Sequence, residues 1–115
     1  MTDQTLTVTL DPRPTGPAVV AVEGELDHHT APQLSEVLDA VGERGVVVDL
    51  TGLAYCDSTG ISVLVIAYQQ ARAADTPFAL AGLNHELSRV FQIMGLDKVL
   101  PFHPTVAEAV TGLPR

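Results

Sequence analysis

The chain has 115 residues, of which 46% are hydrophobic, and its mean hydropathy is +0.25. This length suits one domain with its own core, so we expect residues 1–115 to form a single domain with a folded core over about 5–112. The formal net charge is −8, with five Arg and one Lys, which leaves no basic cluster for direct binding to DNA or RNA.

Two further features of the composition concern the compartment. No run approaches the ~20 apolar residues that cross a bilayer, and residues 1–4 lack the charged and apolar regions of a signal peptide. We therefore expect a cytoplasmic protein.

The single cysteine, Cys56, excludes an internal disulfide. We interpret it as a small, partly buried residue rather than a reactive thiol, because Asp57 beside it would raise its pKa.

The first elements in chain order are two strands and a helix. Residues 6–10 alternate apolar and polar, and residues 18–22 form an apolar run. Three prolines and a glycine between them indicate a turn, so we expect a hairpin with the first strand near a sheet edge. Residues 24–29 are expected to form a loop before a helix with Thr30 as its N-cap, Pro32 in its first turn, and Gln33 completing a capping box with Thr30. The apolar stripe of this helix, ended by Gly42 or Gly45, consists of Leu34, Val37, Leu38 and Val41.

A second strand–helix unit occupies the middle of the chain. Residues 46–50 form a β-branched apolar run typical of a strand buried on both faces, and we expect Gly52 to end it. A helix is predicted from Ser58 to about Ala74. Its first two turns are apolar almost all the way round, which indicates a core face and a partner-facing patch. The core stripe is expected to consist of Ile61, Leu64, Val65 and Tyr68.

The remaining elements are shorter. Residues 77–81 predict a buried strand, and Asn84 is expected to cap a helix that ends at Gly95 in a left-handed conformation. The apolar stripe of that helix is Leu87, Val90, Phe91 and Met94. Residues 99–100 predict a fifth strand, and Thr105 with Glu108 predicts a capping box for a last helix. The element order indicates an α/β fold with a mixed four- to five-stranded sheet and about four helices, mostly on one face.

The four residues Asp57-Ser58-Thr59-Gly60 stand between the buried strand and the long helix. Free backbone N–H groups and the positive end of the helix dipole favour an anion at such a position. Ser58 therefore suits either a plain helix N-cap or a serine that carries a phosphate. We expect Asp57 to order the turn through hydrogen bonds to the backbone and Thr59 to shape the loop.

Several blocks of this sequence resemble the anti-sigma factor antagonist family, which is built on the STAS domain. They are Gly24-Glu25-Leu26-Asp27, the Val-Val-Val-Asp-Leu-Thr-Gly-Leu stretch of residues 46–53, the Asp57-Ser58-Thr59-Gly60 motif, and Arg-Val-Phe-Gln-Ile-Met-Gly-Leu at residues 89–96. The motif alone is weak, but the blocks occur in order and the resemblance covers residues 5–112. The STAS fold that it implies agrees with the fold predicted from the pattern.

The resemblance also implies a function. The unphosphorylated protein would bind an anti-sigma factor that is also its serine kinase, and so free a sigma factor. Phosphorylation of Ser58 would switch binding off, and a serine/threonine phosphatase would reset it. ATP would belong to the kinase, so we expect no cofactor, no metal and no enzymatic activity in this chain. The alternative is a STAS scaffold or ligand-binding module without phosphorylation. The implied partner-binding residues are Asp27, Asp57, Ser58, Thr59, Gly60, Ile61 and Ser62.

Other chemistries fit the sequence poorly. Asp49 at a strand end would suit a phospho-accepting receiver domain, but the acidic pair and the Lys-Pro dipeptide of such domains are absent. A serine hydrolase would need glycine two residues before Ser58, where Cys56 stands. His28 and His29 are adjacent and have no third ligand, so we expect exposed loop histidines rather than a metal site. The family more often has small or apolar residues there, so partner specificity is expected to differ.

Overall fold

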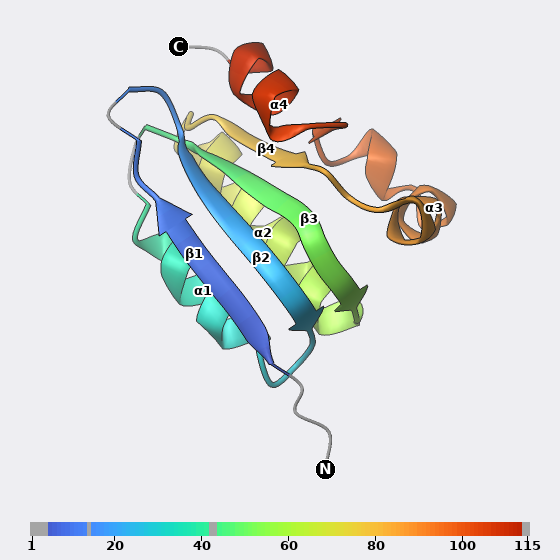
Figure 1. The fold of residues 1–115 in the computed structure, drawn as a ribbon. Helices are drawn as coiled ribbons and strands as arrows, with labels where there is room; N and C mark the ends of the chain where they lie inside the picture. The colour runs from blue at the N-terminus through green and yellow to red at the C-terminus, as the bar shows by residue number, and fades with distance from the viewer. Residues whose placement is uncertain (1–4, 14, 42–43, 114–115) are drawn as a thin grey trace.

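The computed structural model describes residues 5–13, 15–41 and 44–113 and has a five-stranded mixed sheet, shown in Figure 1. The strands are β1 (Leu6–Asp11), β2 (Ala18–Leu26), β3 (Val46–Cys56), β4 (Phe78–Ala81) and β5 (Phe102–His103), and this is also their order in the sheet. β1 pairs antiparallel with β2, and all other pairs are parallel. The predicted hairpin and the edge position of the first strand are therefore confirmed.

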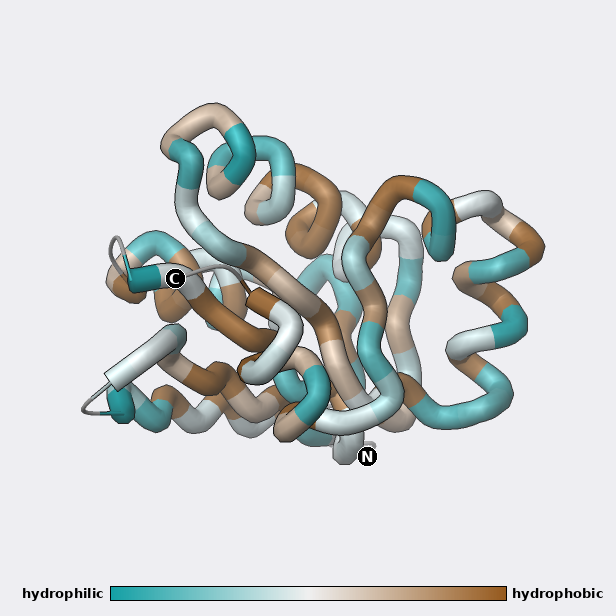
Figure 2. Tube along the Cα trace, turned by 90° about the horizontal axis from the view of Figure 1, so that it is seen from above, coloured by the Kyte–Doolittle hydropathy of each residue, from teal (hydrophilic) through white to brown (hydrophobic). Residues whose placement is uncertain are grey.

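Helices cover both faces of the sheet unequally. α1 (Ala31–Asp39), α2 (Ser58–Ala73) and α3 (His85–Ile93) contribute to the larger core, and α1 and α2 pass behind the sheet in Figure 1. α4 (Val106–Gly112) packs on the opposite face. The trace in Figure 2 shows helices coloured alternately brown and teal, as expected of segments that bury one side only. Helices mostly on one face were predicted, and the structure agrees.

The central strands β3 and β4 carry the core because both of their faces are covered. Val47 of β3 and Ala79 of β4 face α4, whereas Val48 and Leu80 face α1 and α2 side chains. All four are fully buried. Such strands read as continuous apolar runs, which is why the pattern predicted them correctly. None of the helices in the described ranges has both the length and the apolar character that a bilayer crossing requires.

Two strands are longer than the sequence predicted. β3 continues through Gly52 to Cys56, and β2 continues through Gly24 to Leu26, which was predicted to be loop. The two pair along their whole length, with register shifts near Glu23 and Glu25. A Cβ atom on Gly52 would lie 2.6 Å from Cγ of Glu23, so this glycine allows close approach of the strands instead of ending one.

The last part of the chain differs in detail from the prediction. Residues 99–100 are not a strand; a 3₁₀ turn η1 (Leu96–Lys98) precedes them, and the fifth strand is Phe102–His103. Of the predicted stripe only Phe91 is fully buried, against Phe102 of β5, whereas Val90 of α3 and Met94, which follows it, are 44% and 53% exposed. Gly95 follows α3 with φ 76°, the predicted left-handed conformation.

The predicted helix caps are confirmed for α3 and α4 but not for α1. Asn84 accepts from Leu87 N and Thr105 from Glu108 N, as expected. Thr30 makes no capping bond to α1, and the Gln33 amide donates to the Leu6 carbonyl of β1 instead, so that capping box is wrong. α1 ends at Asp39 with Ala40 as its C-cap, so Gly45, which directly precedes β3, does not end it; Gly42 lies outside the described residues.

Candidate functional site

The N-terminus of α2 is capped by Asp57, not by Ser58. Asp57 Oδ1 accepts from Gly60 N at 3.0 Å, and the Asp57 carbonyl accepts from Ile61 N at 3.0 Å. Ser58 is the first residue of the helix proper. The carboxylate therefore takes the capping role, as the predicted turn-ordering function of Asp57 requires. The hydroxyl of Ser58 is left free of that role.

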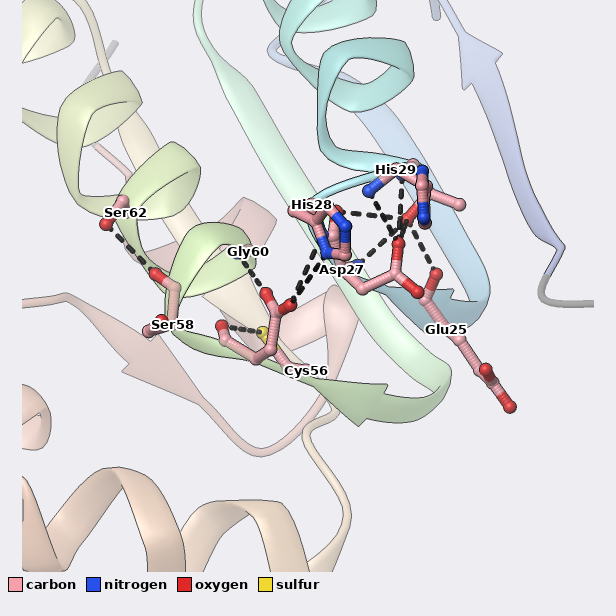
Figure 3. Close-up of polar contacts among 10 residues, drawn as sticks. Glu25, Asp27, His28, His29, Cys56, Ser58, Gly60 and Ser62 are labelled. Carbon is pink, nitrogen blue, oxygen red and sulfur yellow. Dashed lines mark hydrogen bonds and ion pairs between the residues drawn. The ribbon is translucent and has the colours of Figure 1, made fainter.

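Asp57 also joins α2 to the loop between β2 and α1. Its Oδ2 accepts from His28 N at 3.2 Å, and its own N–H donates to the Leu26 carbonyl at 3.0 Å. β2 and β3 are parallel, so both strands end on the same side of the sheet. In α/β folds binding sites form beyond these carboxyl ends of the strands. Residues 27–30 and the first turn of α2, predicted from separate parts of the sequence, are thus adjacent (Figure 3).

Asp27 organises this loop from inside. Its side chain is 4% exposed, and Oδ1 accepts from His29 N at 2.9 Å and Thr30 N at 3.0 Å. The Thr30 hydroxyl lies 3.3 Å from the same oxygen and donates to the Glu25 carbonyl at 2.8 Å. Burial opposes ionisation, but these hydrogen bonds outweigh it and lower the pKa of Asp27. A partner would meet the loop that this carboxylate shapes rather than the carboxylate itself.

The first turn of α2 presents hydroxyl groups to solvent. Ser58, Thr59 and Ser62 are all exposed, and Ser62 Oγ donates to the Ser58 carbonyl at 2.9 Å (Figure 3). The backbone N–H groups of Ser58 and Thr59 donate to no other group within the described part of the chain. This turn therefore offers an accessible serine beside two free donors at the positive end of a 16-residue helix.

Gly60 and Ile61, also among the predicted partner-binding residues, are buried. A Cβ on Gly60 would lie 2.7 Å from Leu26 Cγ and 2.9 Å from Cys56 Sγ. Only glycine lets the first turn of α2 approach the ends of β2 and β3 this closely. These two residues position the exposed hydroxyls and are not themselves open to a partner.

His28 and His29 are exposed, as predicted, and their ring centroids are 4.1 Å apart. His28 Nδ1 lies 4.0 Å from Asp57 Oδ2, so the imidazole flanks the capped helix end. Within the described residues, no three His, Cys, Asp or Glu side chains gather as a metal site would require. Burial, and then the charge of Asp57, raise the pKa of the half-buried Cys56 to about 12, which agrees with an unreactive thiol.

Two neighbouring features could be read only from the structure. Tyr55, two residues before Asp57, is 49% exposed, and Ile66 of α2 is 51% exposed. The apolar first turns of α2 signalled a surface patch without showing which residues form it. Asp49 is half-buried within β3, where it accepts from Thr51 N at 3.0 Å and from the Thr51 hydroxyl, and this gives it a structural role.

Comparison with known proteins places this geometry in a family. Residues 10–109 match the STAS domain. The anti-sigma-B factor antagonist of Listeria monocytogenes is 35% identical over 98 residues, which cover 83% of this chain and 86% of that protein. Among solved structures, an anti-sigma factor antagonist from Mycobacterium paratuberculosis superposes with a TM-score of 0.87 at 29% identity, over 97% of both chains.

A third likeness concerns the fold alone. The Bacillus cell fate determinant SpoIIAA, solved in its phosphorylated form, matches with a TM-score of 0.68 at 21% identity, over 91% of this chain and 97% of that one. Fold and sequence together define a STAS domain protein. The chain belongs to the anti-sigma factor antagonist family, as its sequence motifs predicted.

Proposed function

We propose that this protein is a phosphorylation-controlled antagonist: its unphosphorylated form binds an anti-sigma factor that is also a serine kinase, and this binding frees a sigma factor. The observation that carries the proposal is the exposed Ser58 in the first turn of α2, beside the loop of residues 27–30. The names of the relatives support an anti-sigma factor as partner, since they are antagonists of such factors.

Charge explains how the switch would act. A phosphate on Ser58 adds roughly −1.5 to −2 charges at neutral pH. The two free N–H groups of the first turn tolerate that charge locally, so the fold need not change. A partner fitted to a neutral hydroxyl would have to desolvate the phosphate. A coupling of about 1–3 kcal/mol would weaken binding roughly 5–150-fold.

The surface proposed for the partner combines the exposed hydroxyls of Ser58, Thr59 and Ser62 with the backbone of residues 27–30. Asp57, Gly60, Ile61 and the buried Asp27 hold this surface in place. His28 and His29 add two imidazole rings at its border, and we propose that they tune the choice of partner. The chain would act as substrate and competitor rather than enzyme, with ATP bound by the kinase and a phosphatase resetting Ser58.

The test is incubation with a cognate anti-sigma factor kinase and ATP, followed by mass mapping and binding measurements. We expect one phosphate, on Ser58, that is absent from Ser58→Ala and present in the matched control Ser62→Ala. We also expect the phosphorylated protein to bind the kinase at least about fivefold more weakly. An unmodified protein that still binds would favour an unregulated STAS scaffold. Equal affinity of the two forms would reject the switch.

A further inference from the structure

The outer edge of β1 carries unpaired backbone groups. In an antiparallel pair, residues alternate between those that bond to the neighbouring strand and those whose N–H and C=O point away from it. Glu25 N donates to the Thr5 carbonyl at 3.2 Å, and Leu6 lies opposite Gly24. Thr5 therefore bonds to β2, and by the same alternation the backbone groups of Thr7 and Thr9 also bond to β2.

The alternate residues Leu6, Val8 and Leu10 consequently direct their backbone groups outward, away from β2. One contact supports this assignment, because the Gln33 side-chain amide of α1 donates to the Leu6 carbonyl at 2.8 Å. Figure 1 shows β1 as the outermost strand of the sheet on this side. The N–H and C=O groups of Val8 and Leu10 have no partner within the described residues.

Between Leu6 and Asp11 this edge has few of the features that usually prevent strands from pairing between molecules. Residues 5–10 contain no charge and no proline, and they have high β-propensity. Val8 packs against the core but is only partly buried, and Leu10, which shares its face of the strand by alternation, is 41% exposed. An edge segment without charge over residues 5–10 and with a half-exposed leucine is a template for another strand.

We propose that β1 pairs antiparallel with β1 of a second copy of this chain, which joins the two sheets into one. Because β1 is self-complementary, a two-fold axis at Val8 sets Val8 opposite Val8 and Leu6 opposite Leu10 of the second copy. Asp11 then faces Thr5 of the second copy, so no like charges oppose each other across the pair. Leu10 of each copy then lies beside Leu6 of the other on the same face of the joined sheet.

Two features limit the strength of this pairing. Each copy carries a net charge of −8, and the Gln33 amide must release the Leu6 carbonyl. One strand per copy also buries less surface than the roughly 1,200–2,000 Å² of a stable interface. The association is therefore weak, and it tightens with added salt because salt screens the repulsion between copies. It uses neither Ser58 nor an anti-sigma factor.

The test measures mass by analytical ultracentrifugation and amide exchange by NMR, from micromolar to millimolar protein. We expect the average mass to rise with concentration from 12.1 kDa toward twice that value. The Val8 and Leu10 amides should gain protection at high concentration. The Thr7 and Thr9 amides, already bonded to β2, should be protected throughout.

Leu10→Lys and Ile93→Lys form a matched pair of variants. Both replace an exposed apolar residue with a cation, but Ile93 lies on α3 and is 80% exposed. We expect Leu10→Lys to weaken association about tenfold or more, since lysine protects strand edges, and Ile93→Lys to leave it unchanged. A concentration-independent mass, unchanged Val8 and Leu10 exchange, or loss of association only in Ile93→Lys would overturn the proposal. None of these outcomes bears on phosphorylation, because no kinase or phosphate is present.

Discussion

Asp57 makes two separable contacts, so two substitutions can assign a free energy to each. Asp57→Ala removes the cap on Gly60 N and the acceptor for His28 N. Loss of an N-cap costs about 1 kcal/mol, and loss of a solvent-exposed hydrogen bond about 0.5–1.5 kcal/mol. We expect a total of about 1.5–2.5 kcal/mol, which lowers the Tm of a domain of this size by about 6–12 °C.

Asp57→Asn separates the two terms, because its single carbonyl oxygen can cap Gly60 N while its amide nitrogen cannot accept from His28 N. Urea unfolding should place its stability between wild type and Asp57→Ala. The control is Glu36→Ala, which removes an exposed carboxylate of α1 that makes no hydrogen bond within the described residues, and should change stability by less than about 0.5 kcal/mol. If Asp57→Ala matched this control, or if Asn were as damaging as Ala, the capping argument would be wrong.

Three further outcomes follow from the site. The pKa of Asp27 is lowered from 3.8, so the stability that this carboxylate provides is complete above that value and is lost as pH falls through the folded pKa. Urea unfolding at several pH values should therefore show a smaller acid-induced loss of stability in Asp27→Asn than in the wild type. The pKa of Cys56 is raised to about 12, so iodoacetamide at pH 8 should alkylate folded protein at least ~10-fold more slowly than urea-unfolded protein, and equal rates would contradict this. Gly60→Ala should cost about 1–3 kcal/mol by overpacking against Leu26, measured beside the solvent-facing Ser62→Ala, and a cost near zero would mean that the helix shifts freely.

The sequence predicted best where one physical requirement dominates. The buried strands at residues 46–50 and 77–81 were found because a strand covered on both faces must be apolar throughout. Asn84 and Gly95 were placed correctly as the ends of α3, since local backbone chemistry decides such positions. The order of strands and helices followed from these elements, and the five-stranded mixed sheet agrees with it.

Prediction failed where a distant neighbour decides the outcome. Gly52 reads locally as a break, yet β2 supplies a partner that keeps it in a strand. Thr30 and Gln33 match a capping box, but the Gln33 amide bonds instead to the Leu6 carbonyl of β1, 27 residues away, and the Thr30 hydroxyl bonds to the Glu25 carbonyl of β2. Val90 and Met94 fit an apolar stripe but are exposed, because α3 packs mainly against η1 and buries only Phe91, whose ring contacts Phe102 of β5.

Local sequence pattern was enough to predict most strands and helices, the family to which the chain belongs, and the serine at the start of a helix. Periodicity, caps and a short motif depend on residues close together in the chain, so they can be read without a fold. Three facts needed the folded chain: Asp57 rather than Ser58 caps α2, Asp27 is buried, and the loop after β2 adjoins that helix. Those facts arise from parallel strands that bring their carboxyl ends together, and no local pattern records that pairing.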